Sequence, residues 1–266
     1  MHDKRHAGDI SITRYFPRDT LTLGVNLSVE NDYVSRGVSF SGTHGSEDKN
    51  TTLNYGVGTS DDHITSQGVD QGKNTIDLML GVTQVITPTD IAQLTITHTK
   101  GHGYFTDPYK LLDFRPREKN QSTLLLRWNH FIEGPDATLK ISYRYYNDSW
   151  DISAHSLSAE YVQPLGNGWT LTPMMRLHDQ SAASFYVDPG GVSGFPPYRS
   201  YDQRISAFGA RSLGIKIAKE IDANWSADLK YEYYEQRGSW RFFGDGSPGL
   251  DPFHAQILQI GLSRKF

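Results

Sequence analysis

The sequence predicts an all-β protein, an antiparallel up-and-down transmembrane β-barrel with about 12–14 strands in this chain. Three observations support this fold class. Apolar and polar residues alternate with the period of two that a pleated strand imposes. Short turn clusters alternate with long polar connections. Aromatic residues make up 12% of the 266 residues, and such residues form the girdles of a barrel at both membrane interfaces.

Composition narrows the alternatives. The chain has no run of about 18 apolar residues, which excludes a spanning helix. Its mean hydropathy of −0.53 is compatible with a barrel, whose strands need only about 10 residues of alternating character each. There is no cysteine, so no disulfide forms. The net charge of −4 provides no basic surface for nucleic acid, and we expect no nucleic-acid partner.

The connections are predicted from clusters of Gly, Pro, Asp and Asn. Such clusters indicate tight hairpins at residues 17–20, 46–50, 87–90, 134–136, 166–168 and 222–224. Longer polar segments follow at residues 63–73, 107–121, 187–199 and 242–252. Bacterial outer-membrane barrels have short periplasmic turns and longer extracellular loops, so we place the long segments outside.

The strands between these connections have one apolar and one polar face. The first clear example has an apolar face made of Leu21, Leu23, Val25, Leu27 and Val29. The same alternation recurs over residues 75–83, 137–146, 225–233 and 253–266, the last ending on Phe266. A soluble β-sandwich is the alternative, and it requires Ile141, Leu229 and Leu258 to meet in a central core. A barrel turns these residues toward lipid.

The strand count bears on the domain organisation. From Asp9 onward we count about thirteen strands, and the last runs toward the periplasm, whereas single-chain bacterial barrels have even numbers. The first nine residues also lack a secretory signal. We therefore expect residues 1–266 to form a single barrel domain that lacks one or more N-terminal strands and the signal peptide. The complete barrel would have about 12–16 strands.

Polar and aromatic motifs lie where strands are predicted to meet the outer loops. They are ENDYVSRG (residues 30–37), GYFTDPYK (103–110), RPREKN (115–120), YRYYNDSWDISAHSL (143–157), QSAASFY (180–186) and SYDQRIS (200–206). Through these motifs the chain resembles a family of Gram-negative outer-membrane proteins known only as a domain of unknown function. The resemblance implies a multi-pass barrel in the bacterial outer membrane. It implies no substrate, cofactor or catalytic residue.

The predicted inward faces carry charges of both signs. These candidate lumen and constriction residues are Glu30, Asp77, Arg127, Lys140, Arg144, Asp148, Glu160, Arg176, His178, Lys216, Asp228, Lys230 and Glu232. They would line a hydrated channel that selects solutes, or pair into a rigid network that fills the interior. We expect Arg144 to pair with Asp148, or with Arg176 and Asp202, and so to stiffen the barrel rim. The alternative is a constriction that selects ions or small anionic solutes.

One outer-loop motif is predicted at Asp107, Pro108, Tyr109 and Lys110, at the start of what we expect to be the longest connection. Pro108 fixes its own φ and biases Asp107 toward extended geometry. A rigid turn is therefore the simplest role for the motif. A loop that folds inward as a plug, or outward as a receptor surface, is the alternative.

Chemical sites are weakly indicated. His155 with Ser153 or Ser156 would suit a membrane-embedded lipid hydrolase, but no nucleophile elbow surrounds any serine. His98 and His102 would lie about 13 Å apart on a strand, too far to share an ion. We expect no catalytic residue and no metal or other cofactor; residues 61–63 at a loop edge are a solvated mouth rather than a cation site.

The function that the sequence favours is that of a passive channel or a substrate-specific pore for small hydrophilic solutes. A plugged barrel that anchors a periplasmic export system is the runner-up, and a lipid hydrolase is a remote alternative. The expected partners are the lipid bilayer of the outer membrane and, through the C-terminal strand, the barrel-assembly machinery.

Overall fold

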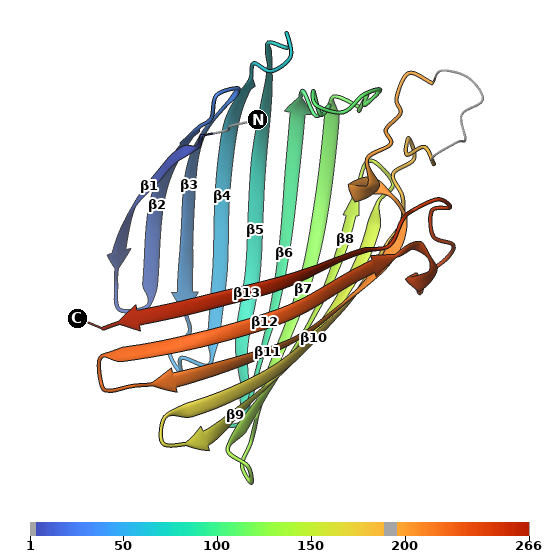
Figure 1. The fold of residues 1–266 in the computed structure, drawn as a ribbon. Coiled ribbons are helices and arrows are strands. Elements are labelled where there is room, and N and C mark those ends of the chain that lie inside the picture. Colours follow the sequence, from blue (N-terminus) through green and yellow to red (C-terminus); the bar gives the residue numbers. More distant parts are fainter. Residues whose placement is uncertain (1–3, 189–195, 266) are drawn as a thin grey trace.

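The computed structural model describes residues 4–188 and 196–265. It consists of one sheet in which thirteen strands follow one another in chain order, each antiparallel to the next (Figure 1). This confirms the predicted fold class and strand count. The strands are β1 (His6–Tyr15), β2 (Asp19–Val29), β3 (Tyr33–Gly45), β4 (Thr51–Ile64), β5 (Gln71–Thr87), β6 (Asp90–Gly103), β7 (Glu118–Ile132), β8 (Ala137–Asp148), β9 (Ser153–Gly166), β10 (Trp169–Gln180), β11 (Phe208–Glu220), β12 (Trp225–Arg237) and β13 (Phe253–Arg264). Two single 3₁₀ turns, η1 (Gln203–Ile205) and η2 (Gly238–Trp240), complete the elements.

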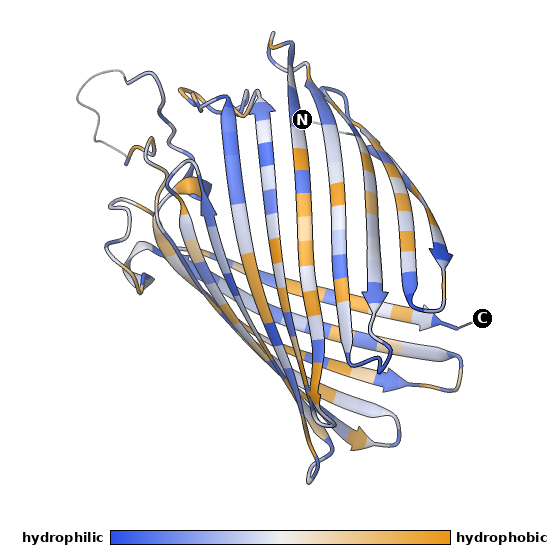
Figure 2. Cartoon of the chain, turned by 180° about the vertical axis from the view of Figure 1, so that it is seen from behind, coloured by the Kyte–Doolittle hydropathy of each residue, from blue (hydrophilic) through white to orange (hydrophobic). Residues whose placement is uncertain are grey.

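Alternation along each strand sorts the side chains onto two faces, as the hydropathy colouring in Figure 2 illustrates. Cross-strand pairing keeps apolar residues opposite apolar residues: Leu229 pairs with Ile260, and Tyr231 pairs with Leu258. Leu229 is 45% exposed and Leu258 is 65% exposed. The cluster of buried apolar residues lies in loops and contains neither of them, nor Ile141. The central core that a soluble sandwich requires does not form around these residues.

The connections differ between the two ends of the sheet. One end, which we call the short-turn end, has the connections 16–18, 46–50, 88–89, 133–136, 167–168 and 221–224. The opposite, long-loop end has the connections 30–32, 65–70, 104–117, 149–152, 181–207 and 238–252. The predicted asymmetry is therefore present. The expectation that Asp107 begins the longest connection is wrong, because the 181–207 connection is longer. It includes SYDQRIS and all of QSAASFY except Gln180, which ends β10.

The hairpin between β9 and β10 shows how sequence sets a tight turn. Gly166, Asn167 and Gly168 have φ values of 84°, 48° and 74°. Glycine and asparagine tolerate this left-handed region better than other residues. A Cβ on Gly168 would lie 2.8 Å from the carbonyl oxygen of Glu220 on the neighbouring strand. Glycine is therefore required there both by its φ and by the close approach of β11.

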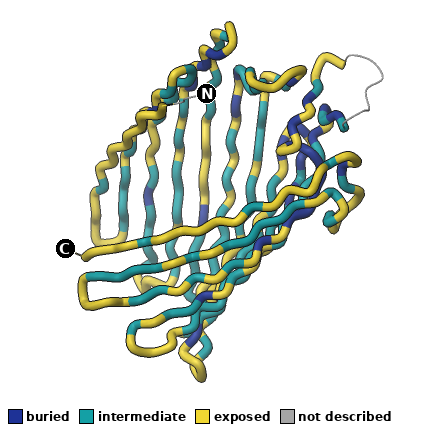
Figure 3. The backbone as a smooth tube through the Cα atoms, in the orientation of Figure 1, coloured by how far each residue is buried: buried dark blue, intermediate teal, exposed yellow. Residues whose placement is uncertain are grey.

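The sheet curls so that β11–β13 cross in front of the lower parts of β5–β8 in Figure 1. Within the described residues no pairing joins β1 to β13, and both of these edge strands run from the long-loop end to the short-turn end. The terminal Phe266, which the alternation placed on the apolar face, lies outside the described residues. No helix in the described part of the chain is long and apolar enough to cross a membrane. The buried residues gather at the long-loop end of β8–β11 (Figure 3).

Candidate functional site

Three connections at the long-loop end, 104–117, 149–152 and the described residues of 181–207, pack into what we call the loop cluster. At its centre the side chain of Asp202 is only 1% exposed. Lys110 Nζ and Arg115 Nη2 each donate to this carboxylate at 2.7 Å, and Arg204 Nε donates at 2.8 Å. Burial alone would raise the pKa of Asp202, but these hydrogen bonds hold the pKa well below its usual range. The ionised carboxylate therefore joins the 104–117 loop to the 181–207 loop.

Two more carboxylates complete the network. Asp113 accepts hydrogen bonds from Arg115 Nε at 2.8 Å and from the backbone N–H of Asp107 at 2.6 Å. Asp107 accepts from Arg204 Nη2 at 2.9 Å and from the backbone N–H of Tyr109 at 3.1 Å. With Asp202 and Lys110, the network has three acids and three bases. A balanced and fully bonded group of this kind holds irregular loops in one arrangement.

An aromatic centre packs beside the charges. Trp150 is 3% exposed, and its ring meets Phe105 and Phe185 edge-on, with centroid distances of 5.7 and 5.2 Å. Its Nε1 donates to the carbonyl oxygen of Glu118 at 3.0 Å, and Lys119 Nζ lies 4.3 Å from the ring centroid. Edge-on aromatic pairs and a cation over a tryptophan ring each add to the apolar burial. The remaining buried members are Ile152, Ala183 and Ile205.

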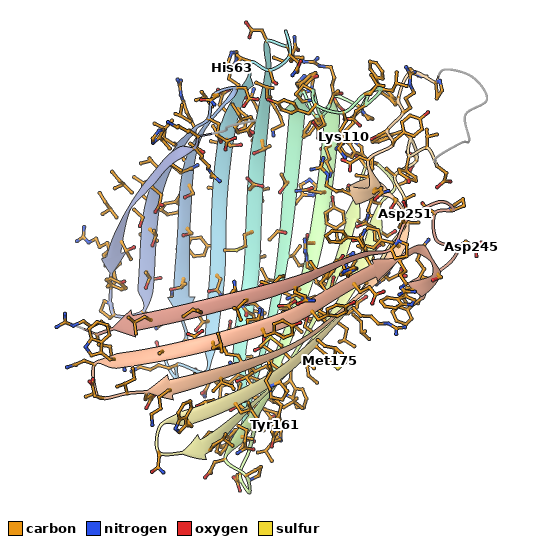
Figure 4. The ribbon with its side chains drawn as sticks, in the orientation of Figure 1. His63, Lys110, Tyr161, Met175, Asp245 and Asp251 are labelled. Carbon is orange, nitrogen blue, oxygen red and sulfur yellow. The ribbon has the colours of Figure 1, made fainter. Side chains whose placement is uncertain are left out.

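The predicted outer-loop motif lies within this cluster. Lys110 sits at the long-loop end, whereas Tyr161 lies near the short-turn end (Figure 4). Asp107 caps the turn at Tyr109, and Lys110 reaches Asp202 in the other loop. Pro108 and Tyr109 help to line a rim cleft of about 410 Å³ with Tyr33 and the other residues Glu30, Asp32, Ile64, Ser66, Lys73, Tyr104, Phe105 and Thr106. The geometry fits a turn that orders the loop.

The predicted lumen residues lie outside the loop cluster, and all of them except Glu30 share the polar face of the sheet. Glu30 lies in the turn after β2 and forms an ion pair with Arg5 at 3.5 Å. The others lie within strands, and the register places them on the face opposite Leu229 and Ile260. They are Asp77, Arg127, Lys140, Arg144, Asp148, Glu160, Arg176, His178, Lys216, Asp228, Lys230 and Glu232.

Some of these residues pair and others do not. Lys230 and Glu232 form an ion pair at 2.8 Å, and Lys216 approaches Asp228 at 3.8 Å. Lys140 and Glu160 are direct cross-strand partners. Among the described residues no carboxylate lies within ion-pair distance of the predicted lumen arginines, which are Arg127, Arg144 and Arg176.

The expected pairing of Arg144 with Asp148, or with Arg176 and Asp202, is wrong. Asp148 Oδ1 accepts from the backbone N–H groups of Trp150 and Ile152 at 2.9 and 3.1 Å, and Oδ2 accepts from Tyr146 at 2.6 Å. Lys119 is its ionic partner at 3.3 Å. An aspartate that immediately precedes a tight turn is well placed to bond the turn backbone. Asp202 is bound by the loop cations instead.

The residues considered for lipid hydrolysis lie on different faces. His155 is on the apolar face, where Nδ1 bonds to the hydroxyl of Tyr143 at 2.7 Å and the ring contacts Phe243 with a centroid distance of 4.9 Å. Ser156 is on the polar face and bonds to Nδ1 of His178 at 2.9 Å. Ser153 donates its backbone N–H to Ser181 Oγ. His155 therefore has neither serine as a hydrogen-bond partner.

The histidine and aspartate pairs considered for metal binding have other partners. His98 Nδ1 bonds to Ser122 Oγ at 2.9 Å, and His102 Nδ1 lies 3.8 Å from Glu118. Asp62 forms an ion pair with Lys73 at 2.9 Å. In the part of the chain that the structure describes, no group of three or more His, Asp or Glu residues could hold a metal ion.

Sequence reasoning missed how the loop cluster is assembled. Arg115 and Asp202 are 87 residues apart in the chain, and Lys110 and Asp202 are 92 apart. Neither spacing follows from a period of two. The available signal was the set of motifs at 103–110, 115–120, 143–157, 180–186 and 200–206, each of which contributes at least one residue to the cluster.

Comparison with known proteins identifies the family of this chain and solved structures with a similar fold. A family model described as "Protein of unknown function (DUF3570)" matches residues 1–72 and 64–256. No curated protein matches the sequence. Among solved structures, the chain is similar to CdiB from Acinetobacter baumannii, with 15% identity, a TM-score of 0.59 and coverage of 98% of this chain and 51% of that chain.

A second similar structure is the siderophore receptor PirA from Pseudomonas aeruginosa, with 10% identity, a TM-score of 0.61 and coverage of 98% of this chain and 55% of that chain. A third is the ferric citrate transporter FecA in the unliganded form, with 12% identity, a TM-score of 0.53 and coverage of 98% and 52%. The chain spans about half the length of these structures. At such identities the likeness establishes the fold, that of an outer-membrane β-barrel.

Proposed function

The chain belongs to the DUF3570 family, whose function is unknown, and we propose that it works in the bacterial outer membrane as a passive, water-filled pore for small hydrophilic solutes. The hydrocarbon of a membrane requires an apolar outer surface on a barrel. The face that carries Leu229 and Ile260 satisfies this requirement. The opposite face then surrounds the interior.

The observation that carries the proposal is the uneven size of the inward side chains. On β3 the inward positions are Ser35, Gly37, Ser39, Ser41 and Thr43, and β2, β4 and β6 are similarly rich in glycine and hydroxyl residues. The inward positions of β7–β12 carry most of the long ionic side chains. We call these the small-residue wall and the ionic wall.

The two walls favour a passage over a filled interior. A network that fills a barrel needs long partners on both sides, since every buried charge must be paired and hydrogen-bonded. The small-residue wall has mainly short hydroxyl side chains and glycines, so it does not supply these long partners. Water and small solutes are suited to occupy the space between a hydroxyl surface and a charged surface.

The test is electrical. Purified full-length protein in a planar lipid bilayer should give stable, ohmic single-channel steps. A folded, heat-modifiable protein that stays silent under the same conditions would overturn the pore. Replacing inward Gly56 by Trp should reduce the step size, and replacing outward Val57 by Trp is the matched control that should leave it unchanged.

A plugged barrel that serves as an anchor or export partner is the second candidate, and the loop cluster favours it. Asp202 and Trp150 hold three connections together at the long-loop end. Ordered loops at one end of a barrel are suited to cover its interior. Disruption of the cluster separates the two functions. D202N should raise conductance in a protein that is silent for this reason, whereas an open pore should keep its steps.

We also infer that the barrel closes through an odd number of further antiparallel strands. Because β1 and β13 run in the same direction, they cannot close the sheet as antiparallel neighbours. Unpaired backbone groups cost several kcal/mol each in hydrocarbon. The chain has no cysteine, so Ile10→Cys with Leu258→Cys tests this in membranes: no disulfide should form, and an efficient disulfide would show direct pairing.

Two partners follow from the proposed location. The lipid bilayer of the outer membrane surrounds the apolar face, and the barrel-assembly machinery engages the C-terminal strand β13. Membrane fractionation of the native protein, with solubility in detergent as the readout, tests the location. Depletion of the assembly machinery should leave the protein protease-sensitive.

A further inference from the structure

We propose that two adjacent rows of inward side chains bind the oxyanion of a small solute, a carboxylate or a phosphate, and make the interior anion-selective. The inference rests on the proposed pore and names the class of solute it would favour. The register defines both rows, because direct cross-strand partners line up across an antiparallel sheet. From β7 to β12 the lower row is Arg127, Ser142, Ser158, Arg176, Ser212 and Tyr234. One step nearer the long-loop end, the upper row is Leu125, Arg144, Ser156, His178, Ala210 and Gln236.

The two rows carry positive charge from arginine side chains. They hold three arginines, which stay charged at any working pH, and no carboxylate. In the next row toward the short-turn end, Glu160 has Lys140 as its cross-strand partner, and Glu232 contacts Lys230 at 2.8 Å. These acids therefore have basic neighbours of their own. Glu232 also interacts electrostatically with Arg176, but among the described residues no ion pair joins an arginine of the two rows to an acid.

The three arginines are positioned by neighbouring side chains, but these contacts occupy few of their N–H donors. Arg176 Nε donates to Ser158 Oγ at 3.1 Å, and Arg127 Nη1 donates to Gln93 Oε1 at 3.3 Å. Arg144 lies with its Cζ 5.9 Å from the ring centroid of Tyr146. A guanidinium has five N–H donors in a planar fork that matches two oxygens of an oxyanion. Each arginine therefore keeps most of its donors for a ligand.

The three arginines are accessible to a ligand in the interior. The side chains of all three arginines are in exposed positions, whereas the paired Lys230 and Glu232 are only 27% and 17% exposed. Arg144 and Arg176 stand two strands and one row apart, which places their Cα atoms about 12 Å from each other. Long guanidinium side chains at that spacing can bind one ligand between them, or the two ends of a dicarboxylate.

Hydroxyl groups fill the places between the cations. Ser142 and Ser158 separate Arg127 from Arg176, and Ser156 bonds to His178 at 2.9 Å. Across the interior the same rows continue through the small-residue wall without an acid. They read Gln93, Thr83 and Thr52 in one row, and Thr95, Gly81 and Asn54 in the other. An anion that enters therefore meets cations on one side and neutral hydrogen-bonding groups on the other.

The experiment measures ion selectivity and ligand block in the full-length protein in planar bilayers. Under a KCl gradient, the reversal potential should show that chloride permeates better than potassium. In R144Q/R176Q the permeability ratio should fall toward unity. K219Q removes one positive charge from the outer face near the short-turn end, and this control should leave the ratio unchanged.

Ligand block separates specific binding from general attraction. Succinate and inorganic phosphate are the two probes, and dimethyl succinate is the uncharged control that should not block. R144K/R176K keeps both charges but loses the planar forks. It should retain the chloride preference and lose most of the block. Block by succinate alone would assign a carboxylate ligand, and block by phosphate alone would assign a phosphate ligand.

The outcomes separate this inference from the pore itself. Clear channel steps with cation preference, or with selectivity that R144Q/R176Q leaves unchanged, would overturn the oxyanion site while the pore stands. If folded protein gives no steps, the pore fails, and calorimetric titration of succinate and of phosphate decides the site. Binding that R144Q/R176Q abolishes supports it, and absence of binding to both probes overturns it.

Discussion

Replacing Asp202 by Asn should loosen the loop cluster without unfolding the barrel. The change removes one charge from a side chain that is 1% exposed and that receives Lys110, Arg115 and Arg204. Breaking a buried ion pair by removing one partner costs about 3–5 kcal/mol. Lys110 and Arg204 are 39% and 67% exposed and can turn to water, whereas Arg115 is 10% exposed. We therefore expect about 3 kcal/mol, near the lower limit.

Hydrogen exchange followed by mass spectrometry measures this cost locally. A loss of about 3 kcal/mol corresponds to roughly a hundredfold faster exchange through local opening. The acceleration should appear in peptides that cover residues 104–117 and 196–207, and not in β2–β5. D251N, an exposed position at the same end, is the matched control. Unchanged exchange in both loops of D202N would refute the role given to this carboxylate.

Three further outcomes are expected. Leu229→Arg should destabilise the folded barrel in lipid by about 2–4 kcal/mol. The inward change Arg127→Gln, at an exposed side chain outside the ion pairs described above, should be tolerated for folding and should alter ion selectivity. Equal costs in urea titrations would contradict the assigned faces. Trp150→Ala should cost about 3–5 kcal/mol of loop-cluster stability and abolish the near-ultraviolet circular dichroism of the loop cluster. A retained signal would show that the aromatic centre does not order the loops. The pKa of Asp202 in the folded protein lies below its unfolded value of about 3.9, so the carboxylate stabilises the loop cluster above that pH and loses this effect as the pH falls through the folded pKa. The near-ultraviolet circular dichroism of the loop cluster should therefore persist from neutral pH to about 4 and decay below. Loss of the signal near pH 6 would contradict this.

The faces of the strands could be predicted from the sequence because one physical rule governs them. A period of two assigns Leu229 outward and Lys230 inward without knowledge of any neighbour. Turn residues such as Gly166 and Gly168 likewise mark hairpins through their own backbone preferences. Local rules therefore yielded the strand count and the two kinds of connection.

The partners of charged residues could not be predicted in the same way. Arg144 and Asp148 lie four residues apart on one face, which on a strand means about 13 Å, the separation that also argues against a shared ion at His98 and His102. Asp148 bonds the turn that follows it instead. The composition of the two arginine rows depends on the register between six strands, which the lengths of the intervening turns set jointly.

The division of the interior into a small-residue wall and an ionic wall has an evolutionary consequence. In the proposed pore, the bore width would depend chiefly on the first half of the chain, and the ion selectivity would depend chiefly on the second half. Substitutions in the first half can therefore widen or narrow the pore while its ion selectivity is preserved. Substitutions in the second half can change the ion selectivity while the width is preserved. If relatives of this protein pass different solutes, their sequence differences should be concentrated in one half of the chain.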